Sequence, residues 1–414
     1  MTSRVTDPEK RVVVTGIGAV TSIGVGARAF LEGLREGRGS ARPITAFDTA
    51  GFDHALGCEV VGFRPAQWLH RHQPEELGRA AQFATAAARM AIDDAALGED
   101  EVRAGRTLVA VGTTDGESRD LDALVGAQVE RGADAGDPAV ARRVPTVRLA
   151  TGIARDLGLT DVEAVSMPTA CAAGNYAIGH GYDAVLAGDV DIALCGGADA
   201  VCRKTFTGFY RLGTIAPEKC RPFDVSRQGI LTGEGAGILV LETLASARAR
   251  GARVYAEVLG YGLNCDAHHP VAPDRASIAR CMRTAHESAG VEAAQVDFIS
   301  AHGTGTKAND ITEAAAIHEV FGRKAPPTVS IKSMIGHTMG AASALAAAAS
   351  ALAIAEQFIP PTVNHVETDP ECALDCVPNE ARPADLRIVQ NNALAFGGNN
   401  AVTLFGRVTG ESAA

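Results

Sequence analysis

The sequence is poor in aromatic residues, in long apolar runs and in closely spaced cysteines. Aromatic side chains make up 5% of the 414 residues, and there is one tryptophan. The most apolar run, residues 339–355, is mostly alanine and is interrupted by Ser343 and Ser350. It is too short and too weakly hydrophobic to cross a bilayer, so we expect a buried helix there and no membrane association.

Nine cysteines are spread thinly along the chain, which is not the pattern of a disulfide-stabilised domain. Residues 1–11 are charged and contain no apolar signal core, so we expect a reducing, cytoplasmic location. Paired C-x-x-C motifs are absent, and Cys171, His302 and His337 lie far apart in the sequence. This spacing predicts no metal site.

Two common classes of ligand are disfavoured by charge and by motif. The net charge of −11 argues against broad nucleic-acid binding. Gly16 and Gly18 follow an apolar run, but a G-x-G-x-x-G motif fails because residue 21 is threonine. We therefore do not expect a dinucleotide site.

Alternating apolar runs and helical patterns predict an α/β fold with mainly parallel sheets. The content of 46% hydrophobic residues and 45 glycines fits a large globular core. Each half of the chain has a strand, a reactive-looking loop and a helix, with Cys171 in the first half and His302 in the second, which hints at an internal duplication. The strand-like runs are 11–16, 108–112, 162–167, 192–197, 237–242, 254–261, 298–301, 393–396 and 401–405, and the helical stretches are 79–96, 175–186, 278–289 and 312–320.

Cys171 stands where an apolar run, residues 162–167, meets a predicted helix at 175–186. A thiol at a strand-to-helix turn lies near the positive end of the helix dipole, which lowers its pKa and favours the thiolate. Small neighbours leave room for a substrate. A cysteine taken alone is more often a buried structural residue, so the interpretation depends on the histidine segments downstream.

Two such segments carry polar groups after apolar runs. His302 begins His-Gly-Thr-Gly-Thr directly after the run that ends at residue 301, where loops place catalytic groups. Lys332 and His337 lie five residues apart, just before the alanine-rich run. A lysine that enters a buried site needs an acidic partner, and Glu313 and Asp310 are the candidates.

Five ordered motifs together resemble one family. The sequence is similar to the β-ketoacyl-[acyl-carrier-protein] synthases, and most of all to the synthase II type and the ketosynthases of type II polyketide pathways. The resemblance runs from about residue 11 to residue 408. Its motifs are Pro-Thr-Ala-Cys at 168–171, Pro-Phe-Asp at 222–224 with Gly-Glu-Gly-Ala-Gly at 233–237, His-Gly-Thr-Gly-Thr at 302–306, Lys-Ser-Met-Ile-Gly-His at 332–337 and Phe-Gly-Gly-Asn at 396–399.

The resemblance implies the thiolase fold, in which two similar α/β halves form a five-layered α-β-α-β-α core, usually as a dimer. We place the halves at 1–256, with the nucleophile, and at 257–414, with both histidines. It implies an acyltransferase that condenses malonyl-[acyl carrier protein] with an acyl group on Cys171, losing CO₂, in fatty-acid or, slightly favoured, type II polyketide synthesis. It requires no cofactor, because the substrates are carried on the phosphopantetheine of an acyl carrier protein.

The resemblance also assigns roles to single residues. Cys171, His302, His337 and Lys332 are the catalytic set, and the backbone N–H groups of Cys171 and Phe396 form an oxyanion hole. The remaining roles are a gate at Phe396 with Gly397 and Gly398, pairing of Lys332 with Glu313, support from Asp310, and binding of the pantetheine arm by Thr304 and Thr306.

Several alternatives stay open at this point. A chain-length factor, the non-catalytic partner subunit of a ketosynthase heterodimer, shares the fold but generally lacks the nucleophile. A coenzyme A thiolase would lack the second histidine in a Lys-x-x-x-x-His context, and a cysteine hydrolase would turn over acyl thioesters without a malonyl donor. A binding module without chemistry is the third alternative. The resemblance implies an acyl carrier protein as the partner, with a second copy or a chain-length-factor-like subunit completing a dimer. The sequence offers no physical account of Arg142 and Arg143.

Overall fold

The computed structural model describes residues 7–408. Ten of its strands form two sets of five that follow the same order. In the first set the order is β6-β5-β7-β9-β1, and in the second it is β12-β11-β15-β16-β10. The strands are β1 (Val12–Thr21), β5 (Thr107–Gly112), β6 (Val162–Met167), β7 (Ile192–Asp199), β9 (Gly235–Thr243), β10 (Ala256–Cys265), β11 (Phe298–Ser300), β12 (Thr328–Val329), β15 (Ile388–Leu394) and β16 (Asn399–Gly406).

The pairing sense repeats as well as the order. β5 runs parallel to β6 and β7, and β11 runs parallel to β12 and β15. β9 is antiparallel to β7 and β1, and β16 is antiparallel to β15 and β10. The two sets meet where Val13 and Val14 of β1 pair with Glu257 and Ala256 of β10. The expected duplication is therefore confirmed, whereas the expectation of mainly parallel sheets is wrong, because half of the pairs in each set are antiparallel.

The repeat also corrects which loops correspond. β6 precedes Cys171, and its counterpart is β12, which precedes Lys332 and His337. β11 precedes His302 and corresponds instead to β5. Cys171 and His302 are therefore not at equivalent positions of the two copies. This finding corrects our expectation that they would be equivalent. The division expected after residue 256 falls at the start of β10 and remains a prediction.

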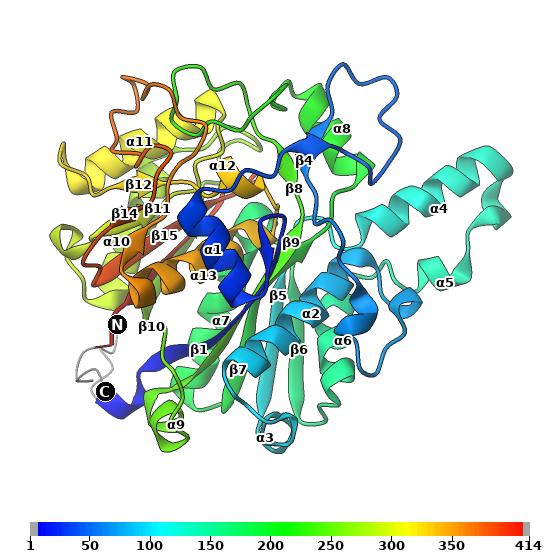
Figure 1. Ribbon diagram of the computed structural model, residues 1–414, viewed down its shortest axis with the longest axis horizontal. Coiled ribbons are helices and arrows are strands. Elements are labelled where there is room, and N and C mark those ends of the chain that lie inside the picture. Colours follow the sequence, from blue (N-terminus) through cyan, green and yellow to red (C-terminus); the bar gives the residue numbers. More distant parts are fainter. Residues whose placement is uncertain (1–6, 409–414) are drawn as a thin grey trace.

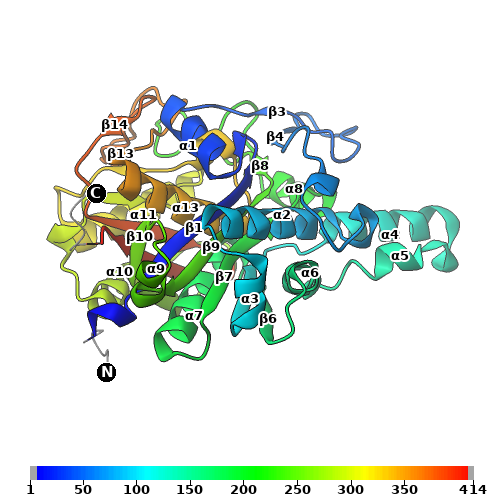
Figure 2. The same cartoon turned by 60° about the horizontal axis from the view of Figure 1, so that its bottom comes forward.

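Helices cover both faces of each set, which produces five layers (Figures 1 and 2). α7 and α13 pack between the sheets, where their apolar side chains share one core with alternate residues of β1, β5, β7 and β9. α2 and α6 cover the outer face of the first set, and α10 and α11 cover the outer face of the second. These six helices are α2 (Arg79–Asp94), α6 (Arg148–Leu157), α7 (Ala173–Ala187), α10 (Arg275–Ala289), α11 (Lys307–Phe321) and α13 (Ala341–Glu356).

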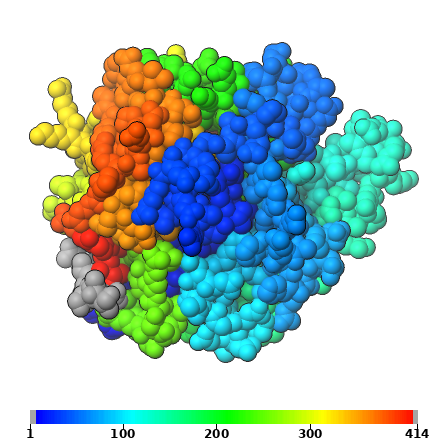
Figure 3. Space-filling view, in the orientation of Figure 1, coloured from blue at the N-terminus to red at the C-terminus, as the bar shows by residue number. Residues whose placement is uncertain are grey.

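Smaller elements surround this core. An arm made of α4 and α5 projects from the body in both ribbon views and in the space-filling view (Figures 1, 2 and 3). None of the helices between residues 7 and 408 combines the length and the apolar character that a bilayer crossing requires. The remaining elements are α1 (Ala27–Glu36), α3 (Glu99–Ala104), α4 (Ser118–Arg131), α5 (Pro138–Ala141), α8 (Arg203–Arg211), α9 (Leu244–Ala249), α12 (Lys332–Ile335), β2 (Gly24–Val25), β3 (Arg42–Pro43), β4 (Leu56–Cys58), β8 (Thr232–Gly233), β13 (Phe358–Ile359) and β14 (Arg382–Pro383).

The glycine pair in β1 has a packing role. A Cβ atom on Gly16 would lie 2.1 Å from the carbonyl oxygen of Ala91, and one on Gly18 would lie 1.7 Å from that of Ala87. Both carbonyls belong to α2, so the glycines let this helix approach β1 closely. This contact accounts for the pair without a nucleotide.

Candidate active site

Cys171 lies at the start of the helix that separates the two sheets. β6 leads into a short 3₁₀ turn, Ala170–Ala172, and α7 follows at once. Ala170 has a φ of 52°, in the left-handed region that is unfavourable for a residue with a Cβ atom. The turn holds Cys171 4% exposed, beneath a cavity between the two halves.

The resting state of this thiol differs from the sequence-based expectation. Burial raises the pKa of Cys171 to about 12, although the positive charge of Lys332 and the backbone N–H of Phe396 act to lower it. Removal from water outweighs these groups because a thiolate loses most of its hydration. The pKa shift is therefore opposite to the lowering that we expected, and it favours the neutral thiol.

His302 is fixed from both sides of its peptide group. The Lys332 ammonium donates a hydrogen bond to the His302 carbonyl oxygen at 2.6 Å and lies 3.5 Å from its Nδ1. The Glu313 carboxylate accepts from the backbone N–H groups of His302 and Gly303, both at 2.8 Å. Lys332 and Glu313 do not form the direct ion pair we expected, because the His302 segment lies between them and bonds to both.

His337 is held by its own loop. Its Nδ1 accepts from the backbone N–H of Met339 at 3.1 Å, so in the neutral ring the proton is on Nε2. The His302 Nδ1 faces a donor, the Lys332 ammonium, and the same reasoning places its proton on Nε2. The two ring centroids are 5.4 Å apart, with the planes nearly perpendicular.

Both histidines are uncharged at neutral pH. Burial and the nearby charge of Lys332 hold the pKa values of His302 and His337 well below 6.5. The pKa of Lys332 is itself lowered by burial, and Glu313 opposes this shift. The site therefore presents two neutral Nε2–H donors, with the positive charge placed behind them.

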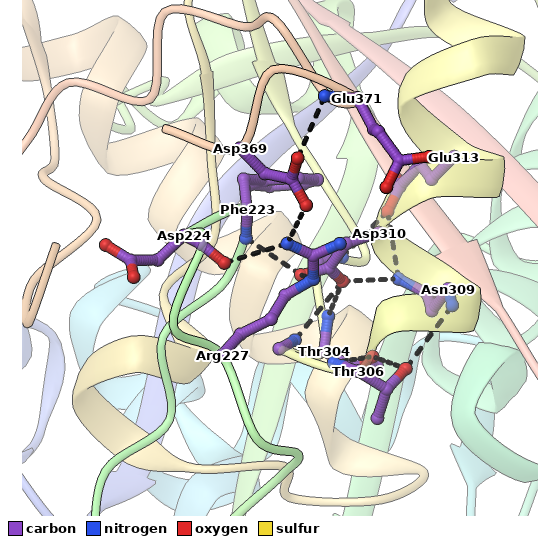
Figure 4. Close-up of polar contacts among 12 residues, drawn as sticks. Phe223, Asp224, Arg227, Thr304, Thr306, Asn309, Asp310, Glu313, Asp369 and Glu371 are labelled. Carbon is purple, nitrogen blue, oxygen red and sulfur yellow. Dashed lines mark hydrogen bonds and ion pairs between the residues drawn. The ribbon is translucent and has the colours of Figure 1, made fainter. Parts of the chain in front are cut away.

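Asp310 shapes the turn that follows His302. One carboxylate oxygen accepts from the backbone N–H groups of Thr304 and Gly305, and the other accepts from that of Phe223. Figure 4 shows this carboxylate beside the buried guanidinium of Arg227, with Nε 3.7 Å from Oδ2. Sequence reasoning missed Arg227, although it lies only three residues after Asp224, the last residue of the Pro-Phe-Asp motif.

The two threonines lie at the cavity but already share a hydrogen bond. Their hydroxyl groups are 2.9 Å apart, and that of Thr306 caps α11 by accepting from the backbone N–H of Asn309. Both residues line the cavity that Cys171 shares with the histidines. They can present hydroxyl groups to a bound chain, and this role remains a prediction.

Phe396 lies at the mouth of the same cavity. The residue is 37% exposed, and its ring packs against that of Phe209 with the ring centroids 5.3 Å apart. Gly397 and Gly398 follow with φ values of 87° and 84°, which only glycine adopts without strain. The cavity holds about 100 Å³ and is lined by Cys171, Phe209, Thr214, Ile230, Val271, Pro273, His302, Thr304, Thr306, Ala308, Asn309, His337, Leu394, Ala395 and Phe396.

The structure also accounts for Arg143, one of the two arginines that the sequence left unexplained. Arg143 forms an ion pair with Asp120 at 2.6 Å and donates to the carbonyl oxygen of Glu75. It therefore ties the base of the projecting arm to the body. Among residues 7–408 no three His, Cys, Asp or Glu side chains gather as a metal site would require.

Comparisons with known proteins show the family of the chain. The Beta-ketoacyl synthase N-terminal domain matches residues 9–247, and its C-terminal domain matches residues 255–366. The chain is 37% identical over 411 residues to 3-oxoacyl-[acyl-carrier-protein] synthase 2 of Synechocystis sp., covering 96% of this chain and 98% of that protein.

Two solved structures share the fold at high similarity. One is the ishigamide ketosynthase/chain length factor, with a TM-score of 0.95 and 59% identity over 96% of this chain and 99% of that one. Another is a ketosynthase bound to the hexaketide in complex with a type II PKS acyl-carrier protein, with a TM-score of 0.89 and 30% identity over 97% and 100% of the two chains. The chain, with its two repeated sheets and its buried Cys171, His302 and His337, thus has the thiolase fold. It belongs to the β-ketoacyl synthase family of acyltransferases.

Proposed function

We propose that this ketosynthase extends an acyl chain held on Cys171 by decarboxylative condensation with a malonyl thioester, both delivered by an acyl carrier protein. One observation carries the proposal. Two neutral histidines, each with its proton on Nε2, share one cavity with a buried thiol. Such a pair can stabilise a developing oxyanion without donating a full positive charge.

The first step is transfer of the acyl group. The Cys171 sulfur attacks the thioester carbonyl, the carrier thiol leaves with the proton, and an acyl-enzyme remains. The backbone N–H of Phe396 already interacts with the Cys171 sulfur, so it is placed to donate to the carbonyl oxygen in the tetrahedral intermediate. The positive end of α7 also favours negative charge at this sulfur during the attack.

The second step makes the new carbon–carbon bond. A malonyl thioester places its carbonyl oxygen against the Nε2–H groups of His302 and His337. Its carboxylate leaves as CO₂, and the electron pair of the broken bond forms an enolate that these donors stabilise. The enolate carbon attacks the acyl carbonyl, and the bond to Cys171 breaks with its electron pair on the sulfur, which takes up a proton from water. The extended chain leaves on the carrier.

The substrate pathway is proposed to be polyketide assembly. The 59% identity to the ishigamide ketosynthase/chain length factor is higher than the 37% identity to the Synechocystis 3-oxoacyl synthase. An acyl carrier protein is the proposed partner, since the type II ketosynthase at 30% identity was solved with one. All nine cysteines lie within the described chain and are free, which fits the reducing cytoplasm we propose.

The second candidate is a chain-length factor that takes no part in the chemistry. The ishigamide structure is named for both a ketosynthase and a chain length factor, so a chain-length factor is a second candidate for this chain. The presence of Cys171, His302 and His337 around one cavity, with Lys332 bonded to the His302 carbonyl oxygen behind it, supports the catalytic reading. The proposed assembly is a dimer, made with a second copy or with a chain-length-factor-like subunit.

Thiol alkylation followed by turnover tests the proposal. Cys265 is the exposed cysteine of the described chain, so the assay uses a Cys265→Ser background in which Cys171 is the remaining reactive candidate. We expect an acyl-carrier-protein substrate to acylate Cys171, malonyl-carrier protein to give a product two carbons longer, and iodoacetamide to stop both. A Cys265→Ser protein that neither acylates nor condenses, alone or with a partner subunit, would favour the non-catalytic reading. A panel of acyl chains with product masses then separates fatty-acid from polyketide substrates.

A further inference from the structure

An unusual run of polar residues crosses the middle of the second sheet. Gln390, Asn391 and Asn392 are consecutive in β15, and all three are buried. A central strand that is covered on both faces is normally apolar. Strand alternation places Gln390 and Asn392 on one face and Asn391 on the other, where Asn391 donates to the Asn175 side chain.

Gln390 and Asn392 belong to a chain of hydrogen bonds that ends at His302. His286 Nε2 lies 2.6 Å from Gln390 Oε1, and Gln390 Nε2 donates to Asn392 Oδ1 at 2.8 Å. Asn392 Nδ2 donates to Glu313 at 3.1 Å. The carboxylate of Glu313 in turn receives the backbone N–H groups of His302 and Gly303.

The direction of every bond is fixed from the carboxylate outwards. Each Glu313 oxygen already accepts a backbone N–H group, one from His302 and the other from Gly303, so Asn392 must present its amide nitrogen to this acceptor. Its oxygen then faces Gln390, which must donate, and Gln390 must accept from a protonated Nε2 of His286. Reversing any one amide would place two acceptors together at a buried site, which is costly.

The outer end of this chain is anchored by packing. His286 lies on α10, is 7% exposed, and meets the ring of Phe321 at the end of α11 edge to face, with centroids 5.5 Å apart. The chain therefore connects the outer helical layer to the loop of His302 through the sheet. Its members come from α10, β15 and α11, which are far apart in the sequence.

We propose that Gln390, oriented by His286, is a positioning residue that fixes His302 by acting through Asn392 and Glu313. It does not touch the substrate, and its effect depends on the donor and acceptor pattern of its amide. The effect on decarboxylation rests on the proposed function, because it concerns the His302 donor in that step. The effect on the order of the His302 loop is independent of the proposed function.

Two substitutions separate an amide that transmits orientation from one that merely fills space. Gln390→Leu keeps the volume and removes both hydrogen bonds. Gln390→Glu restores the pattern when its carboxyl is protonated, since the acid has one donor and one acceptor, and breaks it when ionised. Thr403→Val is the matched control, because Thr403 faces Asn391 across the β15–β16 ladder and its buried hydroxyl has no partner.

The first readout is independent of activity. We expect hydrogen exchange of the peptide covering 301–306 to rise about tenfold in Gln390→Leu, as one lost buried hydrogen bond allows, and to stay unchanged in Thr403→Val. The second readout is malonyl-thioester decarboxylation against alkylation of Cys171. We expect Gln390→Leu to lower the first about tenfold while leaving the second within a factor of about two, a split that general loosening would not give.

The third readout is the pH profile of Gln390→Glu. The titratable groups around this chain of hydrogen bonds are His286 on α10, Glu313 on α11, Lys332 on α12 and His302. The residues that pair with Gln390 on the neighbouring strands, Ile299 and Leu404, are apolar and do not titrate. We expect decarboxylation by this variant to approach the wild-type rate as the pH falls and to decline as the introduced carboxyl ionises.

The outcomes are distinct. Equal exchange in Gln390→Leu and Thr403→Val, or a wild-type pH profile for Gln390→Glu, overturns the positioning role. Absence of decarboxylation by the wild-type protein overturns the proposed function instead, while the exchange data still decide on positioning. If Gln390→Leu does not fold, His286→Phe, which removes the donor, and His286→Gln, which keeps it, give the same contrast in exchange.

Discussion

The Lys332 ammonium lies 2.6 Å from the carbonyl oxygen of His302 and 3.5 Å from its ring nitrogen Nδ1. One charge therefore fixes both the backbone and the tautomer of this histidine. It also makes protonation of the ring unfavourable, because a second positive charge would stand beside it in a buried site. The arrangement keeps a neutral N–H donor in place over the physiological pH range.

Replacing Lys332 with methionine tests this relationship. The variant removes the charge that lowers the pKa of His302 and His337, so both pKa values should rise, though burial still holds them below 6.5. We expect kcat for condensation to fall about 100-fold, with a smaller change in KM. Histidine C–H resonances followed by NMR against pH measure the shift. Unchanged histidine titrations in the variant would contradict the assigned role of the lysine.

Glu117 is predicted to make stability depend on pH. Burial raises the pKa of its carboxyl to about 8, despite the backbone N–H groups of Ala80 and Ala81 that bond to it. A raised folded-state pKa adds stability that is complete below the unfolded value and is lost as the pH rises through about 8. Glu117→Gln should therefore be more stable than the wild type at pH 9, by about 1–2 kcal/mol, and similar at pH 5. Urea unfolding at both pH values measures this. A variant that is weaker at pH 9 would show that the ionised carboxylate is the favoured cap of α2.

Two glycine substitutions are predicted to have opposite effects, because Gly18 lies at the close contact of β1 with α2 and Gly126 lies in open space. Gly18→Ala would place a Cβ 1.7 Å from the Ala87 carbonyl oxygen, so we expect a loss of about 3 kcal/mol or more, or no soluble protein. Gly126 lies within α4, and a Cβ there would meet nothing within 4 Å. Gly126→Ala should raise stability by about 0.5–1 kcal/mol. Equal midpoints of thermal unfolding for the two variants would refute the packing argument.

Phe396 is predicted to control access to Cys171. Phe396→Ala removes the ring that packs on Phe209 at the cavity mouth. In a Cys265→Ser background, we expect alkylation of Cys171 by a bulky maleimide to rise about fivefold or more, and alkylation by iodoacetamide to rise less. Gly397→Ala should slow condensation, since alanine at a φ of 87° is strained by about 1–2 kcal/mol. If Phe396→Ala raised the alkylation rates by both reagents equally, the ring would not be a gate to the cavity.

The strands and helices that pack at the centre were predictable because both of their faces are buried. Runs such as 108–112 and 192–197 are apolar throughout, and β5 and β7 occupy these positions with helices on each side. The sense of pairing was predictable where a Gly-Gly turn joins two apolar runs, 393–396 and 401–405, and β15 and β16 form this hairpin. It was not predictable for the other neighbours, because a pattern of apolar runs does not show whether a neighbour is parallel.

The identity of the site residues was predictable from motifs, whereas their electrostatics and contacts were not. Nothing local to Cys171 indicates that burial outweighs the α7 terminus and Lys332 in setting its pKa. Opposite charge made Lys332 and Glu313 look like a direct pair, but a backbone segment separates them. The polar run in β15 was a visible signal, since three polar residues inside a buried strand break the apolar pattern.

Cys171 follows β6 of one copy, and His302, Lys332 and His337 follow β11 and β12 of the other. The proposed reaction therefore needs residues from both duplicated halves and would take place at the seam between them. Phe209, Thr214 and Ile230, which line the cavity, belong to the half that contains Cys171. We expect substitutions there to change which acyl chain is accepted while the proposed oxyanion donors in the other half stay untouched, so that substrate choice can change separately from the chemistry.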